Sequence, residues 1–267
     1  MLIIKIGGGK NINYRGIIQN LKLLKDKYLI VHGANYLRDQ IAHQLNYQIK
    51  TLTSPQGYTS IKSDPELIKI FLMSYSGLRN KELVTLAQQN SINAIGLTGL
   101  DACLIIGKRN QKIITKQGKK LKIIKNDLSG KPHKINKKLL HYLLKNNYVP
   151  FLCPPILSQN KQAINTENDS IVALISQQML TVKTIVHFIA APGLLKNFSD
   201  QSSLIKKIKL KQLEKIEKQS VQARMKRKIL AMKSAFNSHV RTIHFCDGRS
   251  QNPIKDFLNQ NGTILTK

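Results

Sequence analysis

Cysteine, aromatic side chains and acidic side chains are all scarce in this chain of 267 residues. The three cysteines, Cys103, Cys153 and Cys246, are odd in number and widely spaced, which indicates reduced thiols rather than disulfides or a zinc site. No apolar run approaches the roughly 18 residues that a membrane span requires, and no secretory leader is recognisable. We therefore expect a cytoplasmic protein that has no membrane partner and whose cysteines are buried.

The shortage of acidic residues leaves a formal net charge of +29, because 43 lysines and arginines face only 14 aspartates and glutamates. Such a charge favours an acidic partner, which could be nucleic acid, lipid or protein. The chain has no zinc-finger spacing and no aromatic-basic sheet motif, and aromatic residues make up only 6% of it. We expect no nucleic acid partner, and we interpret part of the charge as the compositional drift of an AT-rich genome.

Apolar strand-like runs alternate with segments of helical periodicity along the chain. The runs expected to form strands are Leu2–Ile6, Tyr28–His32, Ile92–Leu97, Val149–Cys153, Thr184–Ala190 and Thr242–Cys246. The segments expected to form helices are Tyr14–Lys25, Leu37–Leu45, Pro65–Ser76, Lys81–Gln89, Lys137–Asn146, Asp169–Met179 and Ala223–Asn237. This alternation predicts a three-layer α/β fold, in which an open and mainly parallel sheet has helices on both faces.

A basic interval, Gly107–Lys131, interrupts this alternation. The short runs Ile105–Gly107, Lys112–Lys116 and Lys120–Lys125, with a turn at Gln117-Gly118, predict antiparallel strands that project from the sheet as a basic β-hairpin. Nine lysines and arginines in the interval are offset by a single aspartate. A solvated hairpin accounts for such a run, and so does a surface that binds an anionic partner.

The first predicted strand carries a lysine and leads into three glycines. Lys5 is surrounded by isoleucines, and an ammonium group in a buried strand requires an anion. Gly7, Gly8 and Gly9 allow backbone amides to approach such an anion, so the segment predicts phosphate binding. The alternative is a lysine whose side chain reaches water before an ordinary turn. The two common glycine-rich nucleotide-binding motifs are absent.

Four further segments carry candidate groups. His32–Asn35 and Ala190–Gly193 follow predicted strands, at the sheet edge where ligands of open α/β sheets bind. The acidic segment Ala163–Asp169 precedes an apolar helix, which Asn168 or Asp169 could cap. Alternatively, Asp169 organises lysines or a metal while Asn165 contacts substrate. The basic segment Ala223–Ala231 is either a solvated helix face or an anion site, because its crowded cations repel one another.

Taken together, these segments resemble the amino acid kinase family, and within it the kinases that act on aminoadipate or glutamate attached to an amino-group carrier protein. The resemblance covers essentially the whole chain and rests on Lys5-Ile-Gly7-Gly8, His32-Gly33, Thr53–Gly57, Ser91–Asp101, Ile164–Asp169, Ala191–Leu195, Arg224–Lys228 and Asp247-Gly-Arg249. It implies the amino acid kinase fold and ATP-dependent phosphorylation of a side-chain carboxylate, in lysine or arginine biosynthesis. Mg2+ bridging the ATP phosphates is expected, without a metal site built by the protein alone.

The resemblance also implies roles for individual residues. Lys5 and Lys228 would be catalytic, stabilising the transferring phosphoryl group and the nucleotide side, and Asp169 would hold both lysines in place. The other implied roles are phosphate binding by the amides of Gly7, Gly8 and Gly33, substrate binding by Asn165, Ala34 and Lys62, and nucleotide binding by Ala191, Gly193 and Lys228. Residues 1–180 would form the lobe for the amino acid and the carrier, and residues 181–267 the ATP lobe, in one continuous fold.

The implied partners are a small acidic carrier protein, for which the basic interval offers a surface, and a second copy of the chain in a homodimer. Three departures from the family pattern stand out, and one is Ala190-Ala191, where relatives often have polar residues near the nucleotide. Ile61 stands where relatives have an arginine that binds the carboxylate of the substrate, and Lys62 could replace that arginine only with a local shift. Ala34 replaces a glycine, and we expect its side chain to crowd the phosphate loop. Two alternatives remain open: an N-acetylglutamate kinase, and a non-catalytic basic binding protein on a decayed kinase fold.

Overall fold

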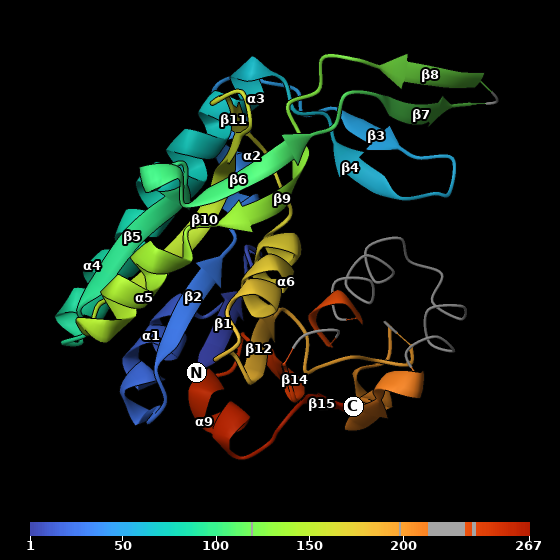
Figure 1. Ribbon diagram of the computed structural model, residues 1–267. Helices are drawn as coiled ribbons and strands as arrows, with labels where there is room; N and C mark the ends of the chain where they lie inside the picture. The colour runs from blue at the N-terminus through green and yellow to red at the C-terminus, as the bar shows by residue number, and fades with distance from the viewer. Residues whose placement is uncertain (119, 198, 213–232, 237–238) are drawn as a thin grey trace.

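Figure 1 shows the computed structural model of the chain, which describes residues 1–118, 120–197, 199–212, 233–236 and 239–267. The strands are β1 (Leu2–Ile6), β2 (Tyr28–His32), β3 (Thr51–Thr53), β4 (Thr59–Ile61), β5 (Ala94–Gly99), β6 (Ile105–Arg109), β7 (Ile113–Gln117), β8 (Lys120–Ile124), β9 (Gly130–Ile135), β10 (Val149–Ser158), β11 (Ala163–Ile164), β12 (Thr184–Ile189), β13 (Lys207–Lys209), β14 (Thr242–Asp247) and β15 (Thr263–Thr266). The helices are α1 (Tyr14–Asn20), η1 (Leu21–Leu23), α2 (Asn35–Gln44), α3 (Pro65–Phe71), η2 (Leu72–Arg79), α4 (Asn80–Gln89), η3 (Asp101–Cys103), α5 (Lys137–Lys145), α6 (Asn168–Gln178), η4 (Gln201–Ser203), η5 (Leu210–Gln212) and α9 (Pro253–Leu258).

An eleven-stranded sheet forms the centre of the molecule, in the order β13-β15-β14-β12-β1-β2-β10-β6-β9, with β5 and β11 also paired to β10. Strand β1 lies in the middle, parallel to β2 on one side and to β12 on the other, and every one of its residues is buried. A strand covered on both faces reads as a continuous apolar run, which is what Leu2–Ile6 shows apart from its lysine. Antiparallel pairs occur at β14–β15, β6–β9 and β10–β11. These are exceptions in a sheet that is otherwise parallel along its order, so the prediction of a mainly parallel sheet is confirmed.

Two hydrophobic clusters lie on opposite faces of this sheet, because successive side chains of a strand point to opposite sides. Ile3 belongs to a cluster that includes residues of α5 and α6, whereas Ile4 belongs to a cluster that includes residues of α1, α4 and α9. A third cluster joins α2 and α3 at one end of the sheet. The predicted three-layer arrangement is therefore confirmed.

Several predicted boundaries are wrong, and tertiary packing explains them. The expected break between Ser76 and Lys81 does not occur: α3, η2 and α4 form one helical run, with η2 in π-helical geometry and Asn80 in right-handed helical conformation. The strand expected at Ile92–Leu97 begins at Ala94 and ends at Gly99, in parallel register with β10. Such shifts arise because strand ends are set by partners distant in sequence, which local periodicity does not specify.

Two hairpins project from one end of the sheet, side by side at the upper right of Figure 1. Strands β7 and β8 pair antiparallel in a sheet of their own, within the basic interval, and β3 pairs with β4. The two hairpins are joined at Thr115, whose buried hydroxyl accepts a hydrogen bond from the Thr53 amide and donates one to the Thr53 carbonyl, both at 3.1 Å. The sequence prediction included the first hairpin and missed the second.

The cysteines follow the prediction only in part. Cys153 and Cys246 are buried, and burial raises the pKa of each thiol to about 12, whereas Cys103 is half-buried. The expectation that all three are buried is therefore wrong for Cys103. Within the described ranges, no helix has both the length and the apolar character that a membrane crossing demands.

A buried histidine closes the second strand, directly before the glycine of the His32-Gly33 pair. The amide of Asn80 donates hydrogen bonds to Nε2 of His32, at 2.9 Å, and to the carbonyl of Phe151, at 3.0 Å. Burial lowers the pKa of the His32 imidazole to about 3, and the charge of Arg79 acts in the same direction. The imidazole is therefore neutral and links β2 to the start of α4.

This histidine predicts a pH dependence of stability. From about pH 6.5, the ordinary pKa of histidine, down to about pH 3, the unfolded chain binds one more proton at His32 than the folded chain. The free energy of unfolding should therefore fall by about 1.4 kcal/mol per pH unit on acidification in this window. His32→Gln should remove this part of the slope in urea unfolding between pH 6.5 and 5, and exposed His43→Gln should keep it. Equal slopes in His32→Gln and the wild type would contradict the assignment.

Candidate functional site

The predicted lysine and aspartate meet at the carboxyl end of the central strand. Nζ of Lys5 lies 3.1 Å from Oδ1 of Asp169, and the lysine is only 8% exposed. Asp169 lies in the first turn of α6, which begins at Asn168, and Glu167 occupies the N-cap position without a side-chain capping hydrogen bond. The alternative that Asn168 or Asp169 caps this helix is therefore wrong, and so is the alternative that Lys5 reaches bulk water.

A histidine that the sequence analysis did not single out completes this group. His187 pairs in register with Lys5 across β1 and β12, and its Nδ1 lies 3.7 Å from Oδ1 of Asp169. Its ring stacks on Phe245 of β14, with the ring centroids 4.7 Å apart. The sequence placed His187 in a predicted strand but could not place it opposite Lys5. The register between two strands is set by their pairing in the sheet and not by a local sequence pattern.

The glycines form a close crossing of two backbone segments. A Cβ added at Gly8 would lie 2.5 Å from the backbone nitrogens of Ala34 and Asn35, and one added at Gly33 would lie 2.9 Å from the nitrogen of Gly8. The loop after β1 therefore touches the N-terminus of α2, a place where backbone amides and the helix dipole favour anions. Among the described residues, the amide of Gly8 has no backbone acceptor, whereas the amide of Ala34 hydrogen-bonds to the Tyr75 hydroxyl.

The amides of the two other glycines are already used inside the sheet. The amide of Gly7 donates to the carbonyl of Phe188, and the amide of Gly33 donates to the carbonyl of Ile6, each at 2.9 Å. These two amides are therefore occupied within the sheet, and of the three predicted phosphate-binding amides the one of Gly8 has no backbone acceptor among the described residues. Ala34 does not crowd this loop, because its side chain is buried in the cluster between α2 and α3.

The predicted substrate residues are joined through a serine. The side-chain amide of Asn165 donates to Oγ of Ser63 at 3.0 Å, and Ser63 directly follows the half-buried Lys62 and the end of β4. The sequence analysis did not identify Ser63, since a lone serine before a helix cap carries no pattern. The structure thus brings Asn165 and the backbone of Lys62 to one side of the site.

The predicted nucleotide residues lie after β12. Ala191 is half-buried, and Gly193 has φ of 158°, where an added Cβ would lie 2.6 Å from both Leu204 and Thr263. The amide of the next residue, Leu194, donates to the hydroxyl of Thr263 at 2.8 Å, which fixes this loop against β15. Lys228 and most of the predicted helix Ala223–Asn237 lie outside the described residues.

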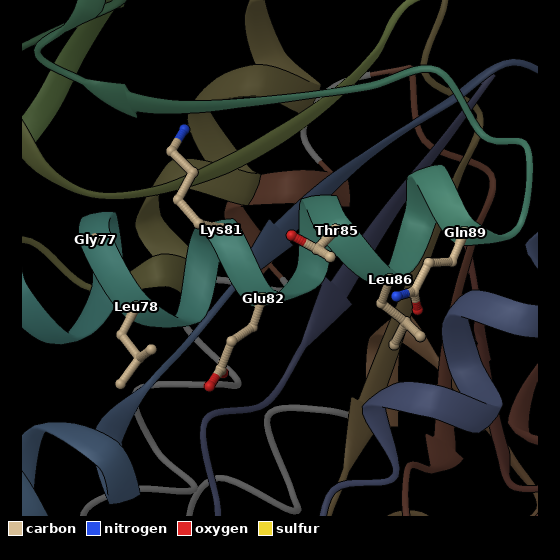
Figure 2. A pocket seen from close by; sticks show the side chains of 7 residues that line it. All are labelled: Gly77, Leu78, Lys81, Glu82, Thr85, Leu86 and Gln89. Carbon is tan, nitrogen blue, oxygen red and sulfur yellow. The ribbon is translucent and has the colours of Figure 1, made fainter.

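A surface pocket of about 430 Å³ lies away from these groups, on η2 and α4. Figure 2 shows that Leu78, Glu82 and Leu86 point to the same side of this helical run and Lys81 to the other. None of the predicted site residues lines this pocket. In the part of the chain that the structure describes, no group of three or more histidine, cysteine, aspartate or glutamate side chains could hold a metal ion.

Comparison with known proteins gives both sequence and structural matches. A family model described as amino acid kinase family matches residues 1–247. The chain is 36% identical to a LysW-aminoadipate kinase of Thermus thermophilus, over 99% of the chain and 100% of the relative. It is 28% identical to an acetylglutamate kinase of Gracilaria tenuistipitata, over 92% of the chain and 84% of the relative. The crystal structure of smu.665 from Streptococcus mutans superposes with a TM-score of 0.76 at 18% identity, covering 99% of this chain and 98% of that chain.

The glycine crossing predicts a matched pair of substitutions. Gly8→Ala would place a methyl group against the backbone of Ala34 and Asn35, so the loop must move and affinity for ATP should fall by about tenfold or more. At Gly9 the nearest atom to an added Cβ is 4.0 Å away, so Gly9→Ala should bind ATP within about twofold of the wild type. Calorimetric titration with ATP measures both, and equal affinities for the two variants would contradict the proposed approach of the loop to phosphate.

Proposed function

The chain belongs to the amino acid kinase family, and we propose that it transfers the γ-phosphoryl group of ATP to a side-chain carboxylate. The proposed acceptor is aminoadipate or glutamate attached to an amino-group carrier protein, and the product is an acyl phosphate of lysine or arginine biosynthesis, made in the cytoplasm. The name of the Thermus relative supports this acceptor. The observation that carries the proposal is the Lys5–Asp169 pair beside the glycine crossing, at the carboxyl end of β1.

Phosphoryl transfer requires charge neutralisation more than covalent catalysis by the protein. A carboxylate oxygen of the acceptor attacks the γ-phosphorus while the bond to the β–γ bridging oxygen breaks, so ADP leaves and negative charge spreads over the phosphoryl oxygens. The ammonium group of Lys5 neutralises this charge, and Asp169, 3.1 Å away, holds that ammonium group in place. Lys228 is proposed to act from the nucleotide side.

The residues around the glycine crossing fit ATP as the phosphoryl donor. The amide of Gly8 offers a donor to a phosphate, and Gly8 itself leaves room that a side chain would fill. Mg2+ bound to ATP would add further charge neutralisation, with the phosphate oxygens as its main ligands. Ala191 and Gly193 are proposed to line the nucleotide site, in a lobe formed by residues 181–267; residues 1–180 would form the other lobe.

The amino-acid side of the site is proposed to contain Asn165, Lys62 and the backbone of Ala34. Ile61 ends β4 and provides no cation, so Lys62 is the nearest cationic residue in the sequence that could bind the free carboxylate of the acceptor. The similarity to an acetylglutamate kinase keeps free N-acetylglutamate as the second candidate acceptor.

The β7–β8 hairpin is proposed as the docking surface for the carrier. In its register, Ile114 pairs with Ile123 and Lys116 with Leu121, so these four side chains share one face. The opposite face carries Thr115, which is buried against β3. The shared face is open: Ile114, Leu121 and Ile123 are 47%, 64% and 54% exposed. An apolar strip with a cationic edge suits an acidic protein, whose approach the basic interval would steer.

A homodimer is proposed through the helical run of Figure 2. Leu72, Met73 and Leu78 are exposed large apolar side chains on η2, and Leu86 continues the stripe along α4. A second copy related by a two-fold axis would cover this stripe with the same residues of its own helix, as in an isologous interface.

The catalytic proposal predicts that Lys5→Met abolishes most turnover. Loss of one charge-stabilising group should lower kcat by about 10²–10³-fold while folding is preserved. ADP release with carrier-linked aminoadipate, carrier-linked glutamate and free N-acetylglutamate measures the activity, and exposed Lys22→Met serves as the control. Efficient turnover of free N-acetylglutamate alone would replace the carrier-linked acceptor by the second candidate. Wild-type activity in Lys5→Met would reject the catalytic role of Lys5, whereas no turnover of any acceptor by the wild type would favour the non-catalytic binding protein.

The docking proposal predicts a selective loss of carrier affinity. The double substitution Lys116→Glu and Leu121→Asp should raise KM for the carrier-linked acceptor by about tenfold, because it reverses a charge and removes an apolar contact. KM for ATP should stay unchanged. Lys138→Glu on α5 with Leu258→Asp on α9 changes charge and exposed apolar surface equally at other sites, so it controls for both. An equal rise of KM in both double variants would contradict docking on this hairpin.

A further inference from the structure

A fully buried carboxylate lies outside the group around Lys5. Asp127, on the segment between β8 and β9, is 0% exposed. Its Oδ2 accepts a hydrogen bond from the amide of Ser63, and its Oδ1 accepts one from the amide of Ser129, both at 2.8 Å. Among the ion pairs of the described residues, none includes Asp127. Burial of a carboxylate is costly, so these two amides must hold it in a defined orientation.

The two amides belong to segments that converge on the substrate side of the site. The Ser63 carbonyl accepts from the amide of Leu128 at 2.6 Å, and the Leu128 carbonyl accepts from the amide of Asn165 at 2.8 Å. The carbonyl of Asn165 in turn accepts from the amide of Gly130 at 2.9 Å. Three stretches far apart in sequence therefore share one backbone network, and Asp127 is the side chain that anchors it.

Ser63 transmits this anchoring to a side chain of the site. Its hydroxyl accepts a hydrogen bond from the side-chain amide of Asn165 at 3.0 Å. That hydrogen bond uses one N–H of Asn165, which fixes the plane of the amide and directs its other N–H and its oxygen. Lys62 precedes Ser63 in the chain, so the position of its backbone is set by the same anchor.

We propose that Asp127 is a positioning residue for the amino-acid substrate: it fixes Ser63, and Ser63 orients Asn165. The proposal rests on the function proposed above. Asp127 acts only on the amino-acid side of the site, through Asn165. The phosphoryl side depends instead on Lys5, Asp169 and the glycine crossing. Asp127 does not itself touch the reacting atoms.

The test is Asp127→Asn, which keeps the size of the side chain but turns one acceptor into a donor that faces a backbone N–H group. KM for the carrier-linked acceptor should rise by about tenfold, with KM for ATP within about twofold of the wild type. Asp101→Asn is the matched control, because the carboxylate of Asp101 also accepts from a backbone amide, that of Thr98, together with the Thr98 hydroxyl, but Asp101 is exposed and begins η3. Its KM values should stay unchanged.

Two substitutions at Ser63 test the relay independently of Asp127. Ser63→Ala removes the acceptor for Asn165 and should raise KM for the acceptor selectively, whereas Ser63→Thr keeps the hydroxyl and should restore nearly wild-type KM. The proposal is overturned if folded Asp127→Asn raises both KM values equally or neither. If Asp127→Asn does not fold, Ser63→Ala decides alone, and an unchanged KM overturns the proposal.

Failure of the proposed function would look different. If the proposed function is wrong, the wild-type protein will turn over none of the acceptors, and this result is obtained before any variant is compared. Calorimetric titration of carrier-linked aminoadipate in the absence of ATP then tests Asp127 by itself. Weaker binding in Asp127→Asn than in Asp101→Asn supports the positioning role, and equal binding overturns it.

Discussion

The candidate site depends on a buried lysine near the carboxyl end of the central strand. Strand β1 has parallel neighbours on both sides and helices on both faces, so the charge of Lys5 has little access to water. Such a charge needs a fixed partner, and Asp169 supplies it from the first turn of α6. Replacement of a buried ion pair by apolar residues is often neutral or stabilising, so the pair is weak support for stability and stronger support for function.

The glycine crossing complements this pair. Gly7 and Gly33 use their amides within the sheet, which holds the loop after β1 close to the end of β2. Gly8 then lies against the N-terminus of α2, at a distance that no side chain would permit. Positive charge from Lys5 and amide dipoles from two segments therefore face one small region, and the neutral His32 beneath it adds no competing charge.

The amino-acid side of the site is organised differently, by hydrogen bonds among polar groups. The Thr53–Thr115 pair joins the two hairpins, and the Ser63–Asp127 hydrogen bond joins the end of β4 to the segment before β9. The hairpin proposed to dock a carrier is thus connected to the residues proposed to orient its substrate. The two halves of the site are built by different physical means, charge on one side and hydrogen-bond geometry on the other.

The amino-acid sequence alone locates the buried strands and most helices, because apolar periodicity is a local property. It also predicts an anion beside Lys5, with access to water as the alternative, and a hairpin in the basic interval. Packing between distant segments places His187 beside Asp169, occupies the amides of Gly7 and Gly33, and joins Ser63 to Ser129 through Asp127. These depend on sheet register and on contacts between distant segments, which no local pattern encodes.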